Sequence, residues 1–218
     1  MYRKRITCLK AVALMLFTTC LFNSGFALQA PDPTPELQTI SNQMIAALKT
    51  NKASMTKNPQ VVYDIVEKIL LPHVDLTVMA RSALGRDAWM NATASEQQAF
   101  TEQFKALLLH TYAAGLSSYT DESVQFDAIR GGIQAGQTRV EVTSQIIRND
   151  GPPIAVSYRL VYELLGSNSA SDWYVYDFSV EGVSMIQSFR AQFAAELSNG
   201  ETLAQLTTKL QAHNTVTN

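Results

Sequence analysis

Residues 154–164 read Ile-Ala-Val-Ser-Tyr-Arg-Leu-Val-Tyr-Glu-Leu, with an apolar side chain at every second position. This alternation indicates a β-strand that buries one of its two faces. Three further segments, 124–128, 138–146 and 173–180, alternate in the same way or are rich in β-prone residues. Short loops containing Gly, Asn, Asp and Pro separate the segments, and short loops favour antiparallel pairing. The sequence therefore predicts an antiparallel sheet of four strands or slightly more.

Helical periodicity is found on both sides of this strand region. Apolar residues recur at spacings of three and four from Glu36 to Leu48, and the polar stretch 49–58 is expected to connect this helix to the next. Thr93-Ala-Ser-Glu96 has the form of a capping box at the start of a long helix. Further helices are predicted over 59–70, 73–85, 184–197 and 201–213, with a short turn at 86–91. Helices followed by strands and again by helices are typical of an α+β fold.

The first 27 residues have the composition of an export signal. Four basic residues precede position 11, an apolar run of about a dozen residues follows, and the segment ends in Ser24-Gly25-Phe26-Ala27. The run is too short to span a bilayer comfortably, which takes about 20 residues. Cleavage is expected after Ala27, with Ala30 as the alternative site. An uncleaved membrane anchor is the competing interpretation.

Removal of this segment changes the charge of the protein. It takes away four of the 17 basic residues and none of the 19 acidic ones, so the formal net charge changes from −2 to −6. Cys8 and Cys20 also leave, so the mature protein has no disulfide and no thiolate site. What remains is predicted to be an extended leader at 28–35, a single domain at 36–213 and a tail at 214–218. Its acidic character gives no sign of nucleic-acid binding.

Motifs that identify enzymes are largely missing from the sequence. There are three histidines but no HExxH pattern, and 131–136 lacks the Lys-Ser/Thr of a phosphate-binding loop. One alternative stays open, namely an enzyme on a similar scaffold that uses His73 as a base with Asp75 or Asp177. Asp75 is equally well placed to cap the helix that follows His73, which is a purely structural role.

Three blocks of sequence resemble a known family. They are Ile69-Leu-Leu-Pro-His-Val-Asp75 with Met79-Ala-Arg81, Leu84-Gly85 and Trp89; Thr93-Ala-Ser-Glu-Gln-Gln98 with Phe100 and Phe104; and Trp173-Tyr-Val-Tyr-Asp177 with Glu181-Gly-Val-Ser-Met-Ile186 and Phe189-Arg-Ala-Gln-Phe193. Taken together and in this order, they resemble the MlaC family, also called the toluene-tolerance family of auxiliary transport proteins. The likeness covers about 36–213, and Glu181–Ile186 is its most specific part.

This resemblance implies a lipid carrier rather than an enzyme. It implies a soluble periplasmic protein that holds a phospholipid by its acyl chains and has an NTF2-like portion around the sheet. It also implies two partners, an outer-membrane lipoprotein–porin complex and an inner-membrane ABC transporter with a lipid-binding ring, between which the lipid moves to maintain outer-membrane lipid asymmetry. No cofactor or metal is expected, because the phospholipid is cargo. A shuttle that works alone is the simplest expectation, so we expect a monomer.

A carrier of this kind needs a closed apolar pocket to shield the acyl chains from water. Each methylene group that leaves water for an apolar environment contributes about 0.8 kcal/mol to the free energy of binding. A lipid is near or above the usual pocket range of about 300–1,000 Å³, so a large apolar cavity is predicted. An adaptor with a filled core is the third possibility. Arg81, Arg148 and Arg190 are candidates for contacts with the headgroup. Face periodicity and the family's placement of the pocket give these expected lining residues: Val78, Met79, Leu84, Phe104, Leu108, Tyr112, Val142, Val156, Tyr158, Leu160, Tyr162 and Val175.

Overall fold

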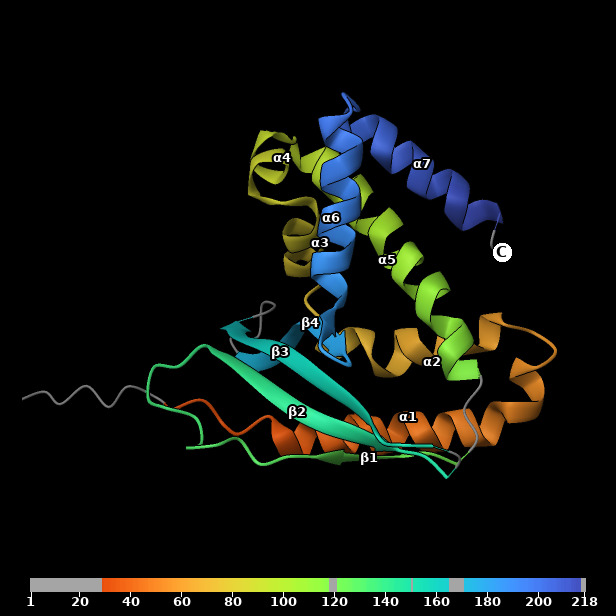
Figure 1. Cartoon of the computed structure of the whole chain (residues 1–218), viewed down its shortest axis with the longest axis vertical. Coiled ribbons are helices and arrows are strands. Elements are labelled where there is room, and N and C mark those ends of the chain that lie inside the picture. The colour runs from red at the N-terminus through yellow and green to blue at the C-terminus, as the bar shows by residue number, and fades with distance from the viewer. Residues whose placement is uncertain (1–28, 118–120, 150, 165–170, 217–218) are drawn as a thin grey trace, which may run out of the picture.

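The computed structural model describes residues 29–117, 121–149, 151–164 and 171–216, so the predicted signal segment 1–27 lies outside the described residues. The helical elements are α1 (Thr34–Met55), α2 (Gln60–Ile69), the 3-10 helix η1 (Leu71–His73), α3 (Leu76–Leu84), α4 (Arg86–Asn91), α5 (Ala94–Ser117), α6 (Met185–Ser198) and α7 (Leu203–Val216). The strands are β1 (Ser123–Phe126), β2 (Arg139–Ile147), β3 (Ile154–Leu164), β4 (Ser171–Val180) and β5 (Val183–Ser184). Figure 1 shows the sheet and α1 at one end of the molecule, with α3, α5 and α6 rising from it and α7 beside α5 at the opposite end.

The strands form one antiparallel sheet in the order β1-β2-β3-β4-β5, so each strand pairs with its neighbour in sequence. The predicted α+β fold and antiparallel sheet are confirmed, and the two-residue β5 adds a fifth strand. In the centre of the sheet, Tyr158 of β3 lies opposite Val142 of β2 and Phe178 of β4. A register shift between Arg159 and Leu160 bends the pairing of β3 with β4. Apolar side chains of three strands therefore share one face.

Local capping signals predicted from the sequence are present at the helix ends. Glu96 accepts hydrogen bonds from the backbone N–H and the hydroxyl of Thr93 at 2.8 and 2.7 Å, and the Glu96 N–H donates to Thr93 Oγ1 at 3.3 Å. The Asp75 carboxylate accepts from the Val78 N–H at 2.8 Å at the start of α3. Gly85 ends α3 with φ of 90°, a conformation that a residue with a Cβ rarely adopts.

Two helices are longer than predicted. The prediction that 49–58 is a connection is wrong, because α1 continues to Met55. Leu48 and Met55 are both 3% exposed and pack against α2, so the helix keeps a buried face while its polar residues face solvent. At the other end of the chain, α7 continues past His213 to Val216. There the Asn214 side-chain amide donates to the Gln103 carbonyl oxygen at 3.0 Å, which ties the last turn to α5.

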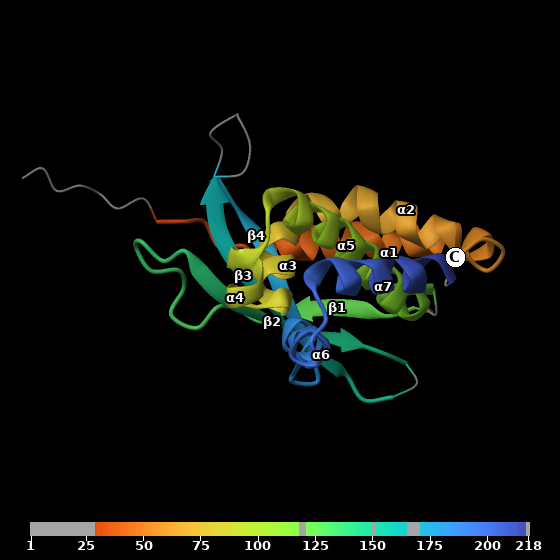
Figure 2. The ribbon, with the colours of Figure 1, turned by 90° about the horizontal axis from the view of Figure 1, so that it is seen from above.

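The apolar side chains form three clusters. The first joins α3–α7 and is centred on stacked and edge-to-face phenylalanines from α5 and α6. The second joins the sheet to the start of α1 and the residues before it, and the third joins α1 to α2. Figure 2, seen from above, shows α1, α2, α5 and α7 extending to one side of the sheet, while α6 is viewed end-on. The two helical groups also contact each other directly, where α5 packs against α2.

The segment Glu181–Ile186 forms the transition from the sheet to the C-terminal helices. Glu181 and Gly182 have φ of 50° and 79°, as the tight turn between β4 and β5 requires. Ser184 then ends β5 and caps α6, because its hydroxyl oxygen accepts from the Gln187 N–H at 3.1 Å. The same hydroxyl donates to the Asp177 carboxylate at 2.7 Å. This short stretch therefore fixes both the turn and the direction of α6.

Asp177 is a buried carboxylate that links the sheet to α6. It is 2% exposed on β4, and it accepts from the Ile186 N–H at 3.1 Å in addition to the Ser184 hydroxyl. The guanidinium of Arg159 on β3 lies 3.5 Å away and supplies a compensating charge. A buried carboxylate is tolerated because these donors satisfy it, so its loss would leave several polar groups without partners.

The variant Asp177→Ala is expected to lower the free energy of unfolding by about 3 kcal/mol, because the donors on Ser184, Ile186 and Arg159 lose their acceptor. Urea unfolding followed by circular dichroism measures this change. The matched control is Asp127→Ala, which removes an exposed carboxylate that accepts one bond from the Thr143 hydroxyl at 2.7 Å. The control should cost less than about 1 kcal/mol. Equal losses in the two variants would contradict the linking role of Asp177.

Candidate functional site

The seam between α1 and the sheet is the candidate site. We define the seam by the residues around a small hollow: Pro33, Glu36, Leu37 and Ile40 at the start of α1, His73 of η1, and Leu160, Trp173 and Val175 of the sheet. The hollow measures about 10 Å³, which is too small to hold more than a single water molecule. The walls of the seam are therefore in contact with each other.

The inner wall of the seam is apolar. Leu160 and Trp173 are 1% and 2% exposed, and Leu37 on the facing helix is 7% exposed. The Trp173 indole N–H donates to the carbonyl oxygen of Pro31 at 2.7 Å, which holds the residues before α1 against the end of the sheet. The Trp173 ring also lies 5.1 Å from that of Tyr162, measured between ring centroids. Strand alternation places these side chains on the face that α1 covers.

The outer rim of the seam carries charged groups. His73 Nδ1 lies 3.2 Å from Glu36 Oε1, and about a third of each side chain is exposed. Burial raises the pKa of the Glu36 carboxyl, Asp172 at the start of β4 raises it further, and His73 opposes both effects. Because the pKa of Glu36 is raised overall, the contact with His73 does not fully offset the effects of burial and of Asp172 on the charged carboxylate.

A row of aromatic rings connects the sheet face to α5. The rings of Tyr112 on α5 and Phe178 on β4 meet edge to face, with centroids 5.1 Å apart. Phe178 is the register partner of Tyr158, whose ring lies 5.6 Å from that of Phe126 on β1. We call Tyr112, Phe178, Tyr158 and Phe126 the aromatic row. Two ring contacts and one register pair thus connect the long helix with β4, β3 and β1.

The residues predicted to line a cavity belong to two clusters. Tyr112 and Phe178 belong to the helical cluster and Phe126 and Tyr158 to the sheet cluster, so the register pair Tyr158–Phe178 lies where the two clusters meet. In the helical cluster, Met79, Leu84 and Phe104 are buried and Leu108 and Tyr112 are partly buried. In the sheet cluster, Val142 and Leu160 are buried and Tyr158, Tyr162 and Val175 are partly buried. Val156 is buried in β3, and Val78 is half-buried in α3.

The three arginines predicted near a headgroup lie on two neighbouring helices and on a turn of the sheet. Arg81 on α3 and Arg190 on α6 are exposed, and the Arg190 guanidinium passes close to Gly85 at the end of α3. Arg148 lies at the turn between β2 and β3. Its guanidinium donates to the Pro152 carbonyl oxygen at 3.0 and 3.2 Å, and it therefore supports this turn.

No residue of α1 is among the predicted lining residues, although α1 forms one wall of the seam. Helical spacing identified Leu37 and Ile40 as one apolar face, but nothing local indicated which element covers that face. The predicted large cavity is not present at the seam, where the hollow measures only about 10 Å³. The physical reason is that Leu37, Leu160 and Trp173 fill this space with their own side chains.

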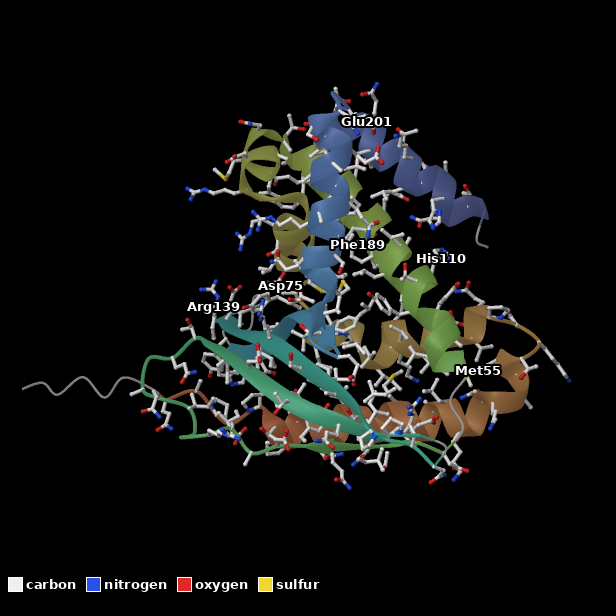
Figure 3. All side chains as sticks on the ribbon, in the orientation of Figure 1. Met55, Asp75, His110, Arg139, Phe189 and Glu201 are labelled. Atoms are coloured by element: carbon white, nitrogen blue, oxygen red, sulfur yellow. The ribbon has the colours of Figure 1, made fainter. Side chains whose placement is uncertain are left out.

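His73 is paired with Glu36 and not with either aspartate of the enzyme alternative. Asp75 instead caps α3, and Asp177 caps α6. Figure 3 shows Asp75 where the helices meet the sheet. Within the described residues, no group of three or more His, Cys, Asp or Glu side chains is placed to hold a metal ion.

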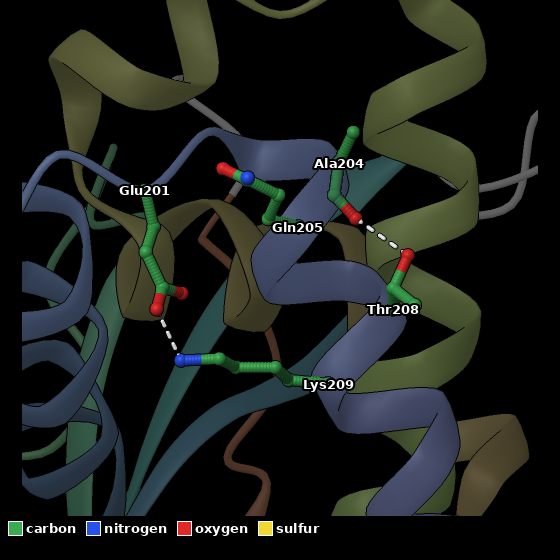
Figure 4. A pocket seen from close by; sticks show the side chains of 5 residues that line it. All are labelled: Glu201, Ala204, Gln205, Thr208 and Lys209. Atoms are coloured by element: carbon green, nitrogen blue, oxygen red, sulfur yellow. Dashed lines mark hydrogen bonds and ion pairs between the residues drawn. The ribbon is translucent and has the colours of Figure 1, made fainter.

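A second hollow, of about 390 Å³, lies on the surface of α7. It is lined by Glu201, Ala204, Gln205, Thr208 and Lys209 (Figure 4). Lys209 pairs with Glu201 there and with Glu196 at 2.8 Å. These charged and polar walls do not suit an acyl chain.

Comparison with known proteins identifies relatives over most of the chain. A sequence model described as MlaC protein matches residues 38–212. The toluene tolerance protein ttg2D of Pseudomonas putida is 28% identical over 80% of this chain and 77% of its own. The intermembrane phospholipid transport system binding protein MlaC of Haemophilus influenzae is 23% identical over 91% of this chain and 89% of its own.

A solved structure has a similar fold. It is the phospholipid-binding protein from Ralstonia solanacearum in complex with a phospholipid, with a TM-score of 0.74 and 28% sequence identity. The match covers 86% of this chain and 99% of that chain. Among the helices that the structure describes here, none has both the length and the apolar character to cross a membrane.

The variant Glu36→Gln is expected to be more stable than the wild type at neutral pH. The folded-state pKa of Glu36 is raised above its ordinary value of 4.5, so the folded protein disfavours the ionised carboxylate relative to the unfolded chain. Glutamine carries no charge and avoids this cost. As the pH falls through the raised pKa, wild-type Glu36 becomes protonated and the difference should disappear. Urea unfolding of lipid-free protein between about pH 4 and pH 7.5 tests this.

Glu102→Gln is the control, because Glu102 is exposed on α5 and pairs only loosely with Lys105, at 3.7 Å. It should not become more stable. A Glu36→Gln protein that is less stable at neutral pH would show that the His73 contact outweighs burial and Asp172.

Proposed function

The chain belongs to the MlaC family, and on this basis we propose that it is a periplasmic carrier that binds a phospholipid by its acyl chains. The observation that carries the proposal is the similarity, over most of the chain, to a fold that holds a phospholipid in a solved relative. The seam and the aromatic row supply what such a ligand needs, namely a long apolar surface between a helix and a sheet. We propose transport, not catalysis, as the activity.

The acyl chains are proposed to lie between α1, the sheet face and α5. They would contact the residues predicted to line the cavity and also Leu37, Ile40, Phe126 and Phe178. Arg81 and Arg190 are kept as candidates for the headgroup. Arg148 is less suited to that role, because its guanidinium already donates two hydrogen bonds to the Pro152 carbonyl oxygen.

Entry of a lipid requires the seam to open, because a hollow of about 10 Å³ cannot accept even part of an acyl chain. Most of the contact between α1 and the sheet is apolar, and apolar contact is non-directional. Acyl chains can therefore replace one wall of the seam with little loss of burial. The directional contacts that must be broken or must move are few, chiefly the Trp173–Pro31 bond and the 3.2 Å bond from the Gln38 amide to the Val124 carbonyl oxygen.

Residues 1–27 are proposed to act as a cleaved signal peptide that exports the carrier to the periplasm, where 36–213 forms the lipid-binding domain. The partners proposed are an outer-membrane lipoprotein–porin complex and an inner-membrane ABC transporter with a lipid-binding ring. The chain has no nucleotide-hydrolysis motif in its sequence. The direction of handover between these complexes would then follow their relative affinities for the lipid, with energy supplied by the transporter, and the outcome would be maintained asymmetry of the outer membrane.

Protein isolated from the periplasm is expected to carry phospholipid. Native mass spectrometry should detect a lipid-bound species, and the lipid-free polypeptide mass should correspond to a chain that begins at Leu28, or at Pro31 for the alternative cleavage site. A delipidated sample should regain lipid from phospholipid vesicles. Protein that is isolated empty and takes up no lipid from vesicles would contradict the proposed function.

Phospholipid with brominated acyl chains is expected to quench the fluorescence of Trp173, because this side chain lies in the seam. The sequence has two tryptophans, so a Trp89→Phe variant reports on Trp173 alone. The Trp173→Phe variant is the matched control, since Trp89 belongs to the helical cluster. Stronger quenching in the first variant than in the second supports the seam as the main site. Stronger quenching of Trp89 than of Trp173 would place the chains elsewhere.

A further inference from the structure

Ser144 is a buried hydroxyl without a hydrogen-bond partner. It lies on β2, is 2% exposed, and its Oγ makes no hydrogen bond. Three other buried side-chain atoms in the described residues share this state, namely Thr34 Oγ1, Glu201 Oε2 and Asn214 Oδ1. Glu201 and Asn214 belong to the α7 region, and Thr34 to the first turn of α1. Ser144 is the member of this group that lies within the sheet.

The surroundings of Ser144 place its hydroxyl beneath the aromatic row. Its register partners are Phe126 on β1 and Val156 on β3, and Val142 precedes it by two positions on the same face. Tyr158 is diagonal to Ser144 across the β2–β3 pair, and its ring leans toward that of Phe126. Two hydroxyls, on Ser144 and Tyr158, are therefore set into a surface that is otherwise apolar.

The electrostatic environment of Tyr158 fits this position. Burial raises the pKa of the Tyr158 hydroxyl, and a polar interaction with the nearby Ser144 hydroxyl lowers it, although the two groups do not meet in good hydrogen-bond geometry. The charged side chains of the neighbouring pairs, Glu141 and Arg159, belong to the opposite face and contact each other at 3.3 Å. Both hydroxyls are therefore neutral donors in an uncharged setting. Such a setting suits a neutral acceptor oxygen better than a phosphate, whose charge would need cationic partners.

A neutral acceptor of this kind occurs in a diacyl phospholipid at the ester carbonyls, where the acyl chains join the glycerol. Resting on the proposed function, we infer that the hydroxyls of Ser144 and Tyr158 donate hydrogen bonds to an ester carbonyl oxygen of the bound phospholipid. The two hydroxyls then set how deeply the lipid enters. They also make the carrier selective for ester-linked lipids, because a diether lipid lacks the carbonyl oxygens and offers both donors only the weaker ether oxygens.

Competition between ester and ether lipids tests this inference. Delipidated protein is incubated with vesicles that contain equal amounts of diester and diether phosphatidylethanolamine, matched in chain length and stereochemistry. Lipid extracted from the reisolated protein is then quantified by mass spectrometry. We expect the wild type to enrich the diester lipid about fivefold, as one or two neutral hydrogen bonds allow. In Ser144→Ala and Tyr158→Phe the enrichment should fall toward one.

Two control variants remove the same atoms elsewhere. Ser157→Ala lies on the opposite face of the sheet, in register with Thr143, and Tyr174→Phe lies on the same opposite face of β4, in register with Val161. Both should keep the wild-type enrichment. The thermal midpoint of lipid-free Ser144→Ala should fall little, because the Ser144 hydroxyl lies near that of Tyr158 but makes no hydrogen bond of good geometry. A clear fall would show that the hydroxyl is already bonded and would overturn the inference.

The failures of the two proposals can be told apart. A wild type that takes up neither lipid contradicts the carrier function itself. A wild type that takes up both lipids equally retains the carrier function and overturns the anchoring role of the hydroxyls. Unchanged enrichment in Ser144→Ala and Tyr158→Phe would also overturn it.

Discussion

The carboxylate of Asp177 joins the sheet to the first turn of α6, and the path of the C-terminal helices starts from this contact. It is buried on β4, accepts from Ser184 and Ile186 at the start of α6, and faces the guanidinium of Arg159. This arrangement sets the direction in which α6 leaves the sheet. The phenylalanines of α6 then reach those of α5, where Phe104 and Phe189 meet edge to face at 5.3 Å. The helical cluster is therefore positioned by a polar contact at its base.

The seam between α1 and the sheet is held differently. Its inner wall consists of apolar contacts that another apolar surface can replace, and its rim contains Glu36, whose charge is disfavoured by burial and by Asp172. Hydrogen bonds to Asp177 fix the start of α6, whereas apolar contacts that acyl chains can replace hold the seam. This difference suits a carrier. One part of the molecule keeps its shape, while the other can exchange its own side chains for acyl chains.

Sequence patterns were most informative where the cause of the structure is local. Alternation over 154–164 identified the central strand, and the capping signals of Thr93, Asp75 and Gly85 are present where they were expected. The predicted end of α1 was too early, because the helix continues to Met55, whose side chain packs against α2. The polar residues of 49–58 do not indicate this tertiary contact. For the site, the sequence supplied the apolar faces of α3, α5 and the strands. It did not supply α1 as the covering wall, nor Phe126 and Phe178 as members of the aromatic row.

The sequence by itself determined the secondary structure, its order and the likeness to one family, because spacing, turn residues and caps act between neighbours along the chain. Only the tertiary structure decided that Trp173 packs beside the residues before α1, that Asp177 serves α6 instead of His73, and that Ser144 is buried without a partner. Each of these facts joins residues that are far apart in sequence or depends on which strand face is covered. Burial and unmet hydrogen bonds are properties of a packed environment, and no local pattern encodes them.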